Sequence, residues 1–191
     1  NATPKITQYK YNITIFANVT DNVGVQTVLV DILGVNYSMS GPPTNYTYTF
    51  NTTDYAVGTY NFTIYANDSG SNYAAPQTGN FTITQAPSTI QLSLNGAQDN
   101  LSVFTSTSVN ITGILSIPVV TENIQLYKNG TVIGNTSSPV TNISTHSVGF
   151  YNISAVYVGN ENYTRDIATW YLTITDNTPP VINSHNASPN S

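Results

Sequence analysis

The side-chain chemistry that this sequence repeats most often is that of an asparagine followed two residues later by serine or threonine. Oligosaccharyltransferases read this triplet, the sequon, and attach a glycan to the asparagine amide nitrogen. With about 25 Asn and about a quarter of positions Ser or Thr, chance would give roughly six sequons. The sequence has seventeen, at Asn1, Asn12, Asn18, Asn36, Asn45, Asn51, Asn61, Asn67, Asn80, Asn100, Asn110, Asn129, Asn135, Asn142, Asn152, Asn162 and Asn186.

This excess predicts a chain displayed outside the cell and carrying covalent N-linked glycans at most of these sites. The alternative is an Asn- and Thr-rich strand protein in which the sequons are idle, because polar alternation along strands also raises their number. Asn177 and Asn183 are expected to stay bare, since Pro179 and His185 take the third positions of their triplets, where a sequon needs Ser or Thr.

Residue types that perform catalysis or bind metals are sparse. His146 and His185 are far apart and flanked by Ser and Thr, which is typical of surface residues, and Glu122 and Glu161 form no acidic pair. The sequence has no Gly-x-Ser-x-Gly elbow, phosphate loop or zinc pattern. We therefore predict that the protein is not an enzyme and needs no metal or other cofactor.

Composition narrows the setting further. Only 7% of residues are charged and the net charge is −5, which argues against a nucleic-acid partner. No apolar run approaches the ~20 residues of a membrane helix. A secreted animal domain of this size would usually carry disulfides, whereas this chain has no Cys. An extracellular chain without Cys indicates a prokaryote.

Apolar and polar residues alternate with a period of two along almost the whole chain, which predicts β-strands. The run at 11–20 would bury Tyr11, Ile13, Ile15, Ala17 and Val19 and expose its sequon asparagines, with Phe16 as an exposed exception. We expect strands in the first half near 10–20, 25–34, 45–52, 59–67 and 79–85. In the second half we expect them near 89–95, 101–105, 108–117, 122–128, 131–136, 140–146, 150–158 and 168–176, with a tight turn at Asn129-Gly130.

The predicted fold class is all-β, with two tandem immunoglobulin-like antiparallel sandwiches. Residues 85–88 (Gln-Ala-Pro-Ser) are the expected linker, which gives domains at 1–86 and 87–177. An internal repeat supports this division: Gly-Thr-Tyr-Asn-Phe-Thr at 58–63 aligns with Gly-Phe-Tyr-Asn-Ile-Ser at 149–154. Gly-x-Tyr before a buried strand is similar to the tyrosine corner of immunoglobulin-like folds, where Phe62 and Ile153 take the position of a disulfide cysteine.

Two stretches carry a resemblance to known families. Residues 89–176, with Leu-Tyr-Lys-Asn-Gly-Thr-Val-Ile-Gly at 126–134 and Tyr-Val-Gly-Asn-Glu-Asn-Tyr at 157–163, resemble the Ig-like repeats of bacterial and archaeal surface proteins. Residues 17–34 look like the Ig-like modules of archaeal surface-layer and adhesin-type proteins. The resemblance implies an extracellular, cell-surface location, and heavy N-glycosylation within that group favours an archaeon. It specifies function poorly.

The last segment, 178–191, is the most unusual. In the families just named, Thr-Pro-Pro-Val-Ile opens a module, but here it follows a completed domain. We expect the domain at 1–86 to lack its own first strand and to receive one from another copy. The donor residues would be Pro180, Val181, Ile182, Asn183, Ser184, His185, Asn186, Ala187 and Ser188, with Val181 and Ile182 near the neighbour's strand at 10–20.

Two other interpretations of this segment stay open: the 191 residues are one period of a covalent tandem array, or 178–191 is a Pro-rich linker without a partner. The donor-strand interpretation and the tandem-array interpretation both predict a head-to-tail polymer of identical copies. In the donor-strand case this is because donor and acceptor lie at opposite ends of the chain. The leading function is therefore a structural subunit of an extracellular filament, sheath or surface layer. The alternative function is a stalk or binding module of a cell-surface adhesin.

Overall fold

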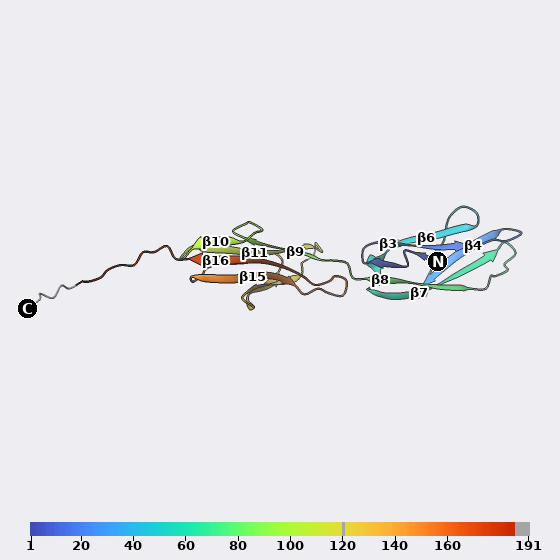
Figure 1. The fold of residues 1–191 in the computed structure, drawn as a ribbon. Coiled ribbons are helices and arrows are strands. Elements are labelled where there is room, and N and C mark those ends of the chain that lie inside the picture. Colours follow the sequence, from blue (N-terminus) through green and yellow to red (C-terminus); the bar gives the residue numbers. More distant parts are fainter. Residues whose placement is uncertain (120, 186–191) are drawn as a thin grey trace, which may run out of the picture. The chain divides into compact units, whose positions relative to one another are not determined.

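The computed structural model describes residues 1–119 and 121–185. It divides into two compact units, one of residues 1–88 with 159–165 and one of residues 89–158 with 166–191. Both are built from β-strands (Figure 1), and the one short helix among the described residues is the 3₁₀ turn η1, Thr52–Asp54. The all-β prediction is confirmed.

The first unit is a sandwich of a three-stranded and a five-stranded sheet. The smaller sheet has the order β1-β3-β6 and the larger has the order β2-β8-β7-β4-β5. This arrangement, with the first strand divided between the two sheets, is that of an immunoglobulin-like sandwich. The strands are β1 (Ala2–Thr3), β2 (Ile6–Gln8), β3 (Asn12–Asn18), β4 (Val25–Ile32), β5 (Val35–Ser38), β6 (Asn45–Asn51), β7 (Gly58–Asp68) and β8 (Gln77–Thr84).

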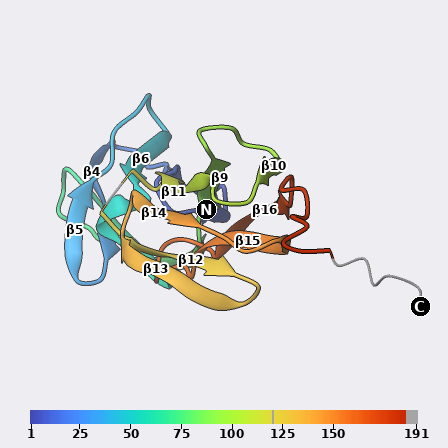
Figure 2. The same cartoon turned by 90° about the vertical axis from the view of Figure 1, so that its left-hand side faces the viewer.

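The second unit repeats this topology. Its sheets have the orders β9-β11-β14 and β10-β16-β15-β12-β13. The β12–β13 hairpin turns at Asn129 (φ 49°) and Gly130 (φ 80°), as the sequence predicts (Figure 2). The strands are β9 (Thr89–Leu94), β10 (Leu101–Phe104), β11 (Ser108–Ile117), β12 (Asn123–Lys128), β13 (Thr131–Ser137), β14 (Val140–Thr145), β15 (Gly149–Tyr157) and β16 (Asp166–Thr175).

Two strand pairs are parallel within the otherwise antiparallel sandwiches. β2 pairs with β8, and β10 pairs with β16, in parallel. In each unit the first strand pairs with the smaller sheet and the chain then crosses to the edge of the larger one. At that edge it runs in the same direction as the last strand.

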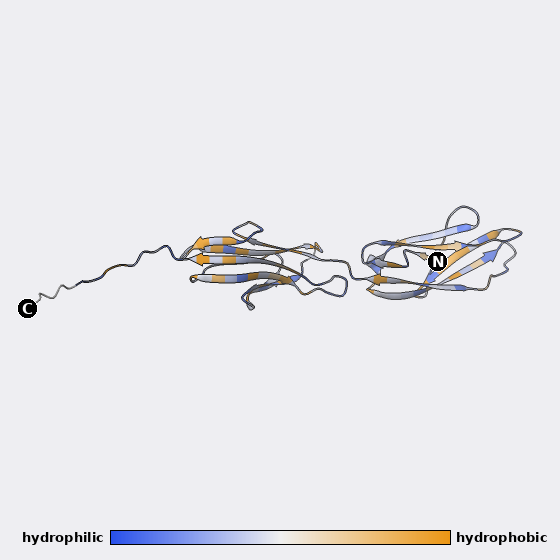
Figure 3. Ribbon diagram, in the orientation of Figure 1, coloured by the Kyte–Doolittle hydropathy of each residue, from blue (hydrophilic) through white to orange (hydrophobic). Residues whose placement is uncertain are grey.

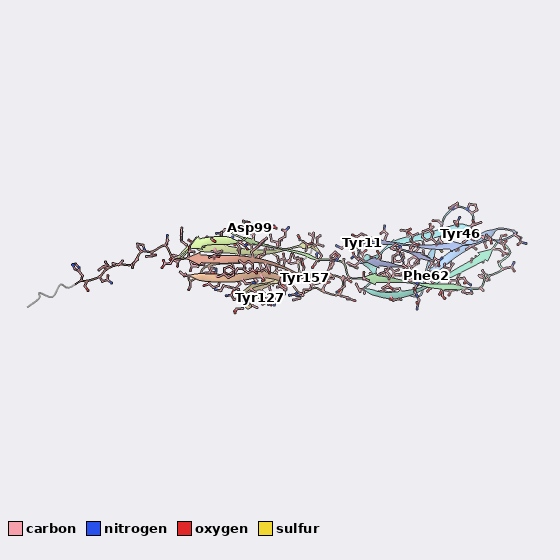
Figure 4. All side chains as sticks on the ribbon, in the orientation of Figure 1. Tyr11, Tyr46, Phe62, Asp99, Tyr127 and Tyr157 are labelled. Atoms are coloured by element: carbon pink, nitrogen blue, oxygen red, sulfur yellow. The ribbon has the colours of Figure 1, made fainter. Side chains whose placement is uncertain are left out.

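Alternating side chains build the two cores, and the alternation is visible as bands of colour along the strands (Figure 3). In β3, Ile13 and Ile15 are fully buried and Phe16 is exposed, as predicted, whereas Tyr11 is 60% exposed rather than buried. The second core includes Tyr157, which is 1% exposed (Figure 4).

Both predicted tyrosine corners are present. The Tyr60 hydroxyl donates to the carbonyl of Ala56 at 2.7 Å, and the Tyr151 hydroxyl donates to the carbonyl of Ser147 at 2.8 Å. Each tyrosine thus ties the start of a long central strand, β7 or β15, to the loop before it. Phe62 and Ile153, two residues further along, are buried as the repeat predicts.

The first unit contains a segment that the sequence analysis placed in the second domain. Residues 159–165 belong to it, because Ala86 exchanges backbone hydrogen bonds with Asn162 and Thr164, and the ring of Tyr163 packs edge-on against Tyr9 at 5.6 Å. The boundary between the two units is therefore not a single point in the linker at 85–88, because residues 159–165 pack with the first unit.

Candidate functional site: sequon asparagines and an open strand groove

The sequon asparagines lie mainly on the wet faces of strands and in turns. Thirteen of the sixteen that the structure describes are exposed, and Asn67, Asn142 and Asn162 are half-buried; Asn186 lies outside the described residues. Exposure follows from the repeated phase, since a buried middle residue turns the asparagine and the hydroxyl residue outward. The exposed thirteen are Asn1, Asn12, Asn18, Asn36, Asn45, Asn51, Asn61, Asn80, Asn100, Asn110, Asn129, Asn135 and Asn152.

Three sequons close an internal hydrogen bond between their own side chains. The hydroxyl of Thr112, Ser144 or Ser154 donates to the amide oxygen of the asparagine two residues before it, at 2.8–2.9 Å. This bond holds the amide oxygen on the hydroxyl side and directs the amide nitrogen away from it. At Asn110 and Asn152 that nitrogen makes no hydrogen bond within the described residues, so it is available for a glycosidic linkage.

Four sequon nitrogens, including that of Asn142, are already used as donors. Asn18 Nδ2 donates to Asn45 Oδ1 at 3.2 Å on the exposed face of the sheet. Asn142 Nδ2 donates to the carbonyl of Ile133 at 2.8 Å, and Asn67 Nδ2 donates to Gln26 Oε1 at 3.0 Å. Asn51 Nδ2 donates to the carbonyl of Lys10 at 2.9 Å. Asn162 differs, because its amide oxygen is buried without a hydrogen-bond partner among the described residues. A glycan at Asn51, Asn67, Asn142 or Asn162 would disturb the local packing or hydrogen bonding.

Six sequon asparagines face each other as three directly opposite pairs. Asn12 pairs with Asn51 and Asn18 with Asn45 across β3 and β6, and Asn61 pairs with Asn80 across β7 and β8. This pairing could not be predicted from the sequence, because the partners are between 19 and 39 residues apart. Opposite Cβ atoms in an antiparallel pair lie about 5 Å apart, so two glycans on one pair would compete for the same space.

The first unit also has an open groove between β3 and β8, with a volume of about 500 Å³. Its lining is mixed: the apolar part includes Ala17, Phe62, Ile64 and Ala66, and polar residues such as Asn18 and Gln77 lie beside them. It is open because the short edge strands cover only part of their partners. β1 reaches Thr14 and Ile15 of β3, and β2 reaches only Thr82–Thr84 of β8.

The groove rim presents free backbone groups on β3. Asn1 and Phe16 exchange both of their backbone hydrogen bonds, at 2.7 and 2.8 Å. In an antiparallel ladder every second residue bonds toward the same neighbour. The N–H and C=O of Asn18 therefore point to the same side as those of Phe16, where the described residues place no strand. This edge is suited to strand addition.

The expectation that the first sandwich lacks its own first strand is wrong in this structure. Ala2–Thr3 pairs with β3, and Ile6–Gln8 pairs with β8. The sequence analysis missed these strands because they have two and three residues, too few to show alternation. Among the described residues, no strand pairs with β3 beyond Phe16 on the side of β1.

The predicted donor segment forms neither helix nor strand as far as the structure describes it. Residues 178–185 are exposed, including Val181 (76%) and Ile182 (85%), and Asn186, Ala187 and Ser188 lie outside the described residues. The two large β-branched side chains are thus exposed to water, and the described part of the segment runs as an extended trace (Figure 1). The donor role stays a prediction.

The few His, Asp and Glu residues that could perform catalysis or bind a metal do not cluster in the described part of the chain. No group of three or more His, Asp or Glu able to hold a metal is found in residues 1–119 and 121–185. His146, expected at the surface, is instead 8% exposed, and its Nδ1 lies 3.5 Å from Lys128 Nζ. Within the same described ranges, no helix has the length and apolar character to cross a membrane.

Comparison with known proteins gives structural similarities at low sequence identity. No family model and no curated protein matches the chain. Among solved structures, the fibronectin(III)-like modules of Clostridium thermocellum CbhA are 17% identical, with a TM-score of 0.40, covering 95% of this chain and 94% of theirs. The amphioxus IgVJ-C2 molecule is 15% identical (TM-score 0.40, covering 88% and 99%), and the D00-D0 domain of intimin is 12% identical (0.32, covering 89% and 95%).

Proposed function

We propose that this chain is a structural subunit of a heavily N-glycosylated archaeal extracellular filament, sheath or surface layer, built head-to-tail from identical copies. The observation that carries the proposal is the open groove of the first unit, together with the exposed apolar segment at the other end of the chain. An unpaired strand edge over apolar residues is costly in water unless a further strand covers it.

A strand entering the groove would meet two kinds of partner. The backbone N–H and C=O of Asn18 would continue the ladder that Asn1 and Phe16 begin. The apolar part of the lining would receive every second side chain of the added strand. Residues 180–188 supply an apolar start, Val181 and Ile182, followed by small and polar residues that suit a strand with one wet face.

The energetic scale is sufficient for a durable contact. Burying one large apolar side chain stabilises the assembly by about 1.5–3 kcal/mol, and ladder hydrogen bonds add to this. Since donor and acceptor belong to different units, each added copy exposes a new groove or a new donor, which extends a filament rather than closing a dimer. Residues placed before Asn1 in a covalent tandem array could fill the groove in the same way.

The glycans would supply the solubility that charge does not. Only 7% of residues are charged, whereas thirteen described sequon asparagines are exposed. A coat of neutral, strongly hydrated sugars on strand faces and turns would protect the polymer from aggregation and proteases. At the strand edge beside the groove, glycans would have to leave room for the added strand.

Deletion of residues 178–191 tests the assembly. We expect the shortened chain to remain monomeric by size-exclusion chromatography with light scattering. A free peptide of residues 178–191 should bind it and raise the unfolding midpoint of the first unit. A matched peptide carrying Val181→Asp and Ile182→Asp should not bind, whereas one carrying Ser188→Asp serves as the control for added charge.

Polymerisation of the shortened chain, or no effect of the peptide, would contradict donor-strand assembly. A tandem array is recognised by one very long chain on a denaturing gel of natural material, and separate subunits by a short one. The adhesin alternative predicts isolated stalks instead of regular fibres when cell-surface material is viewed by electron microscopy.

A further inference from the structure

The exposed aromatic side chains of this molecule gather beside sequon asparagines. Seven aromatic residues are exposed among the described residues: Tyr11, Phe16, Tyr65, Tyr73, Phe104, Phe150 and Tyr171. Four of them precede a sequon asparagine by one or two positions, and a fifth, Tyr171, lies directly opposite Asn152. Exposed aromatic groups in such a shared position indicate an interaction surface.

The clearest case is the outer face of β15 and β16 in the second unit. Phe150 (63% exposed) and Tyr171 (42% exposed) stack with ring centroids 5.1 Å apart and an interplanar angle of 17°. Phe150 lies two residues before Asn152 on the same face of β15, and Tyr171 pairs with Asn152 across the ladder. The two rings therefore form one stacked aromatic pair, called here the aromatic platform, beside the amide of Asn152, and only the ring faces turned away from the partner are open.

The amide of Asn152 is oriented for modification at this place. Its Oδ1 accepts the hydroxyl of Ser154 at 2.9 Å, and Ser154 lies on the side of Asn152 away from Phe150. Its backbone N–H donates to Asn129 Oδ1 at 2.8 Å, and its carbonyl accepts from Asn129 N at 2.9 Å, which fixes the main chain. The free Nδ2 consequently lies on the side of the amide away from the Ser154 hydroxyl.

We propose that the aromatic platform of Phe150 and Tyr171 is a seat for the first sugar of a glycan on Asn152. The inference rests on the proposed glycosylation. A pyranose ring has one face of C–H groups, whose partial positive charge matches the negative face of an aromatic ring. The linkage to Asn152 holds the sugar within reach of both rings, so stacking costs little further entropy.

Glycopeptide mass spectrometry of the natural protein comes first, because it reports whether Asn152 carries a sugar at all. An unmodified Asn152 would overturn both the glycan and its seat at this site. With the glycan present, a double-mutant cycle isolates the contact. We expect Asn152→Gln to lower the Tm of the second unit by roughly 3–8 °C when Phe150 is intact, and by much less in a Phe150→Ala background.

Three controls make the result specific. Asn110→Gln, at a sequon preceded by Ser108, should have the same effect in both backgrounds, and Phe150→Tyr should preserve the coupling. In NMR spectra, protons of the first sugar at Asn152 should shift upfield and should lose the shift in Phe150→Ala. Additive Tm effects without an upfield shift would overturn the proposal. Loss of self-association in Phe150→Ala with no coupling would assign the platform to a second copy instead.

Discussion

Asn51 donates its side-chain Nδ2 to Asn12 Oδ1 at 2.9 Å, across the β3–β6 ladder. The donor and acceptor of this bond can be assigned because Asn51 also bonds to two backbone groups, one of which can only accept and the other only donate. The carbonyl of Lys10 can only accept, and it accepts from Asn51 Nδ2; the N–H of Thr53 can only donate, and it donates to Asn51 Oδ1 at 3.0 Å. Asn12 must therefore present its oxygen to Asn51 and keep its own nitrogen free.

This asymmetry predicts which member of the pair carries a glycan. Asn12 should be modified in most molecules and Asn51 in few, because a glycan on Asn51 removes an amide hydrogen from one of two bonds and meets the sugar of Asn12. Quantitative glycopeptide mass spectrometry measures both occupancies. Asn12→Gln should remove one glycan mass, and Asn51→Gln should leave the mass nearly unchanged. Full occupancy of Asn51 beside an empty Asn12 would contradict the structural reasoning.

Loss of either corner hydroxyl should destabilise its own unit. Tyr151→Phe removes the bond to the Ser147 carbonyl and keeps the ring, so we expect the second unit to lose about 1 kcal/mol of unfolding free energy. Tyr60→Phe should do the same in the first unit through the Ala56 carbonyl. Denaturant unfolding followed by tyrosine and tryptophan fluorescence measures the change.

Tyr171→Phe is the matched control for both corner variants. Its hydroxyl makes no hydrogen bond within the described part of the chain, and the substitution keeps the ring. We expect an unfolding midpoint within about 0.5 kcal/mol of the wild-type value, as for an ordinary surface substitution. Equal losses of unfolding free energy in Tyr60→Phe, Tyr151→Phe and Tyr171→Phe would mean that the hydrogen bonds of the tyrosine corners add no stability of their own.

Alternation and turn chemistry predicted the long strands and both tyrosine corners because these features depend on neighbours in sequence. The strands β1, β2 and β5 were missed, since two to four residues are too few to establish a period. Features set by pairing between distant segments were also out of reach. The facing of Asn12 and Asn51 depends on the β3–β6 register, and the open groove depends on where β1 and β2 end. His146 was misplaced because its neighbours are polar, although the fold buries it.

Gly79 is required by the close approach of the Phe62 ring on the neighbouring strand. A Cβ on Gly79 would lie 2.4 Å from the nearest ring carbon of Phe62, which is 2% exposed and cannot move freely. Gly79→Ala should therefore cost the first unit about 1–3 kcal/mol. Gly58→Ala is the control in the same sandwich, because its nearest neighbour would be 3.7 Å away. An unfolding midpoint for Gly79→Ala equal to that of Gly58→Ala would show that the core yields more easily than its packing implies.

The stability of the second unit should fall as the pH drops below about 6.5, because His146 is held neutral in the folded state. Burial, and then the positive charge of Lys128, lower the pKa of His146 from its usual value near 6.5. The Lys128 ammonium can only donate, so Nδ1 of the imidazole accepts from it and Nε2 carries the proton toward Ser144 Oγ at 3.4 Å. A second proton on His146 would break the contact with Lys128 and place two cations together.

The sign follows from the two states. The unfolded chain binds a proton near pH 6.5 and the folded chain binds it only at a lower pH, so stability is complete above 6.5 and is lost as the pH falls toward the folded pKa. Denaturant unfolding of the second unit between pH 7.5 and 5 should show this loss, and His146→Gln should flatten it. Lys128→Met should make the loss smaller and bring it to completion at a higher pH, because one of the two causes of the lowered pKa of His146 is removed in the folded state alone. Identical pH profiles for the wild-type protein and His146→Gln would contradict the assignment.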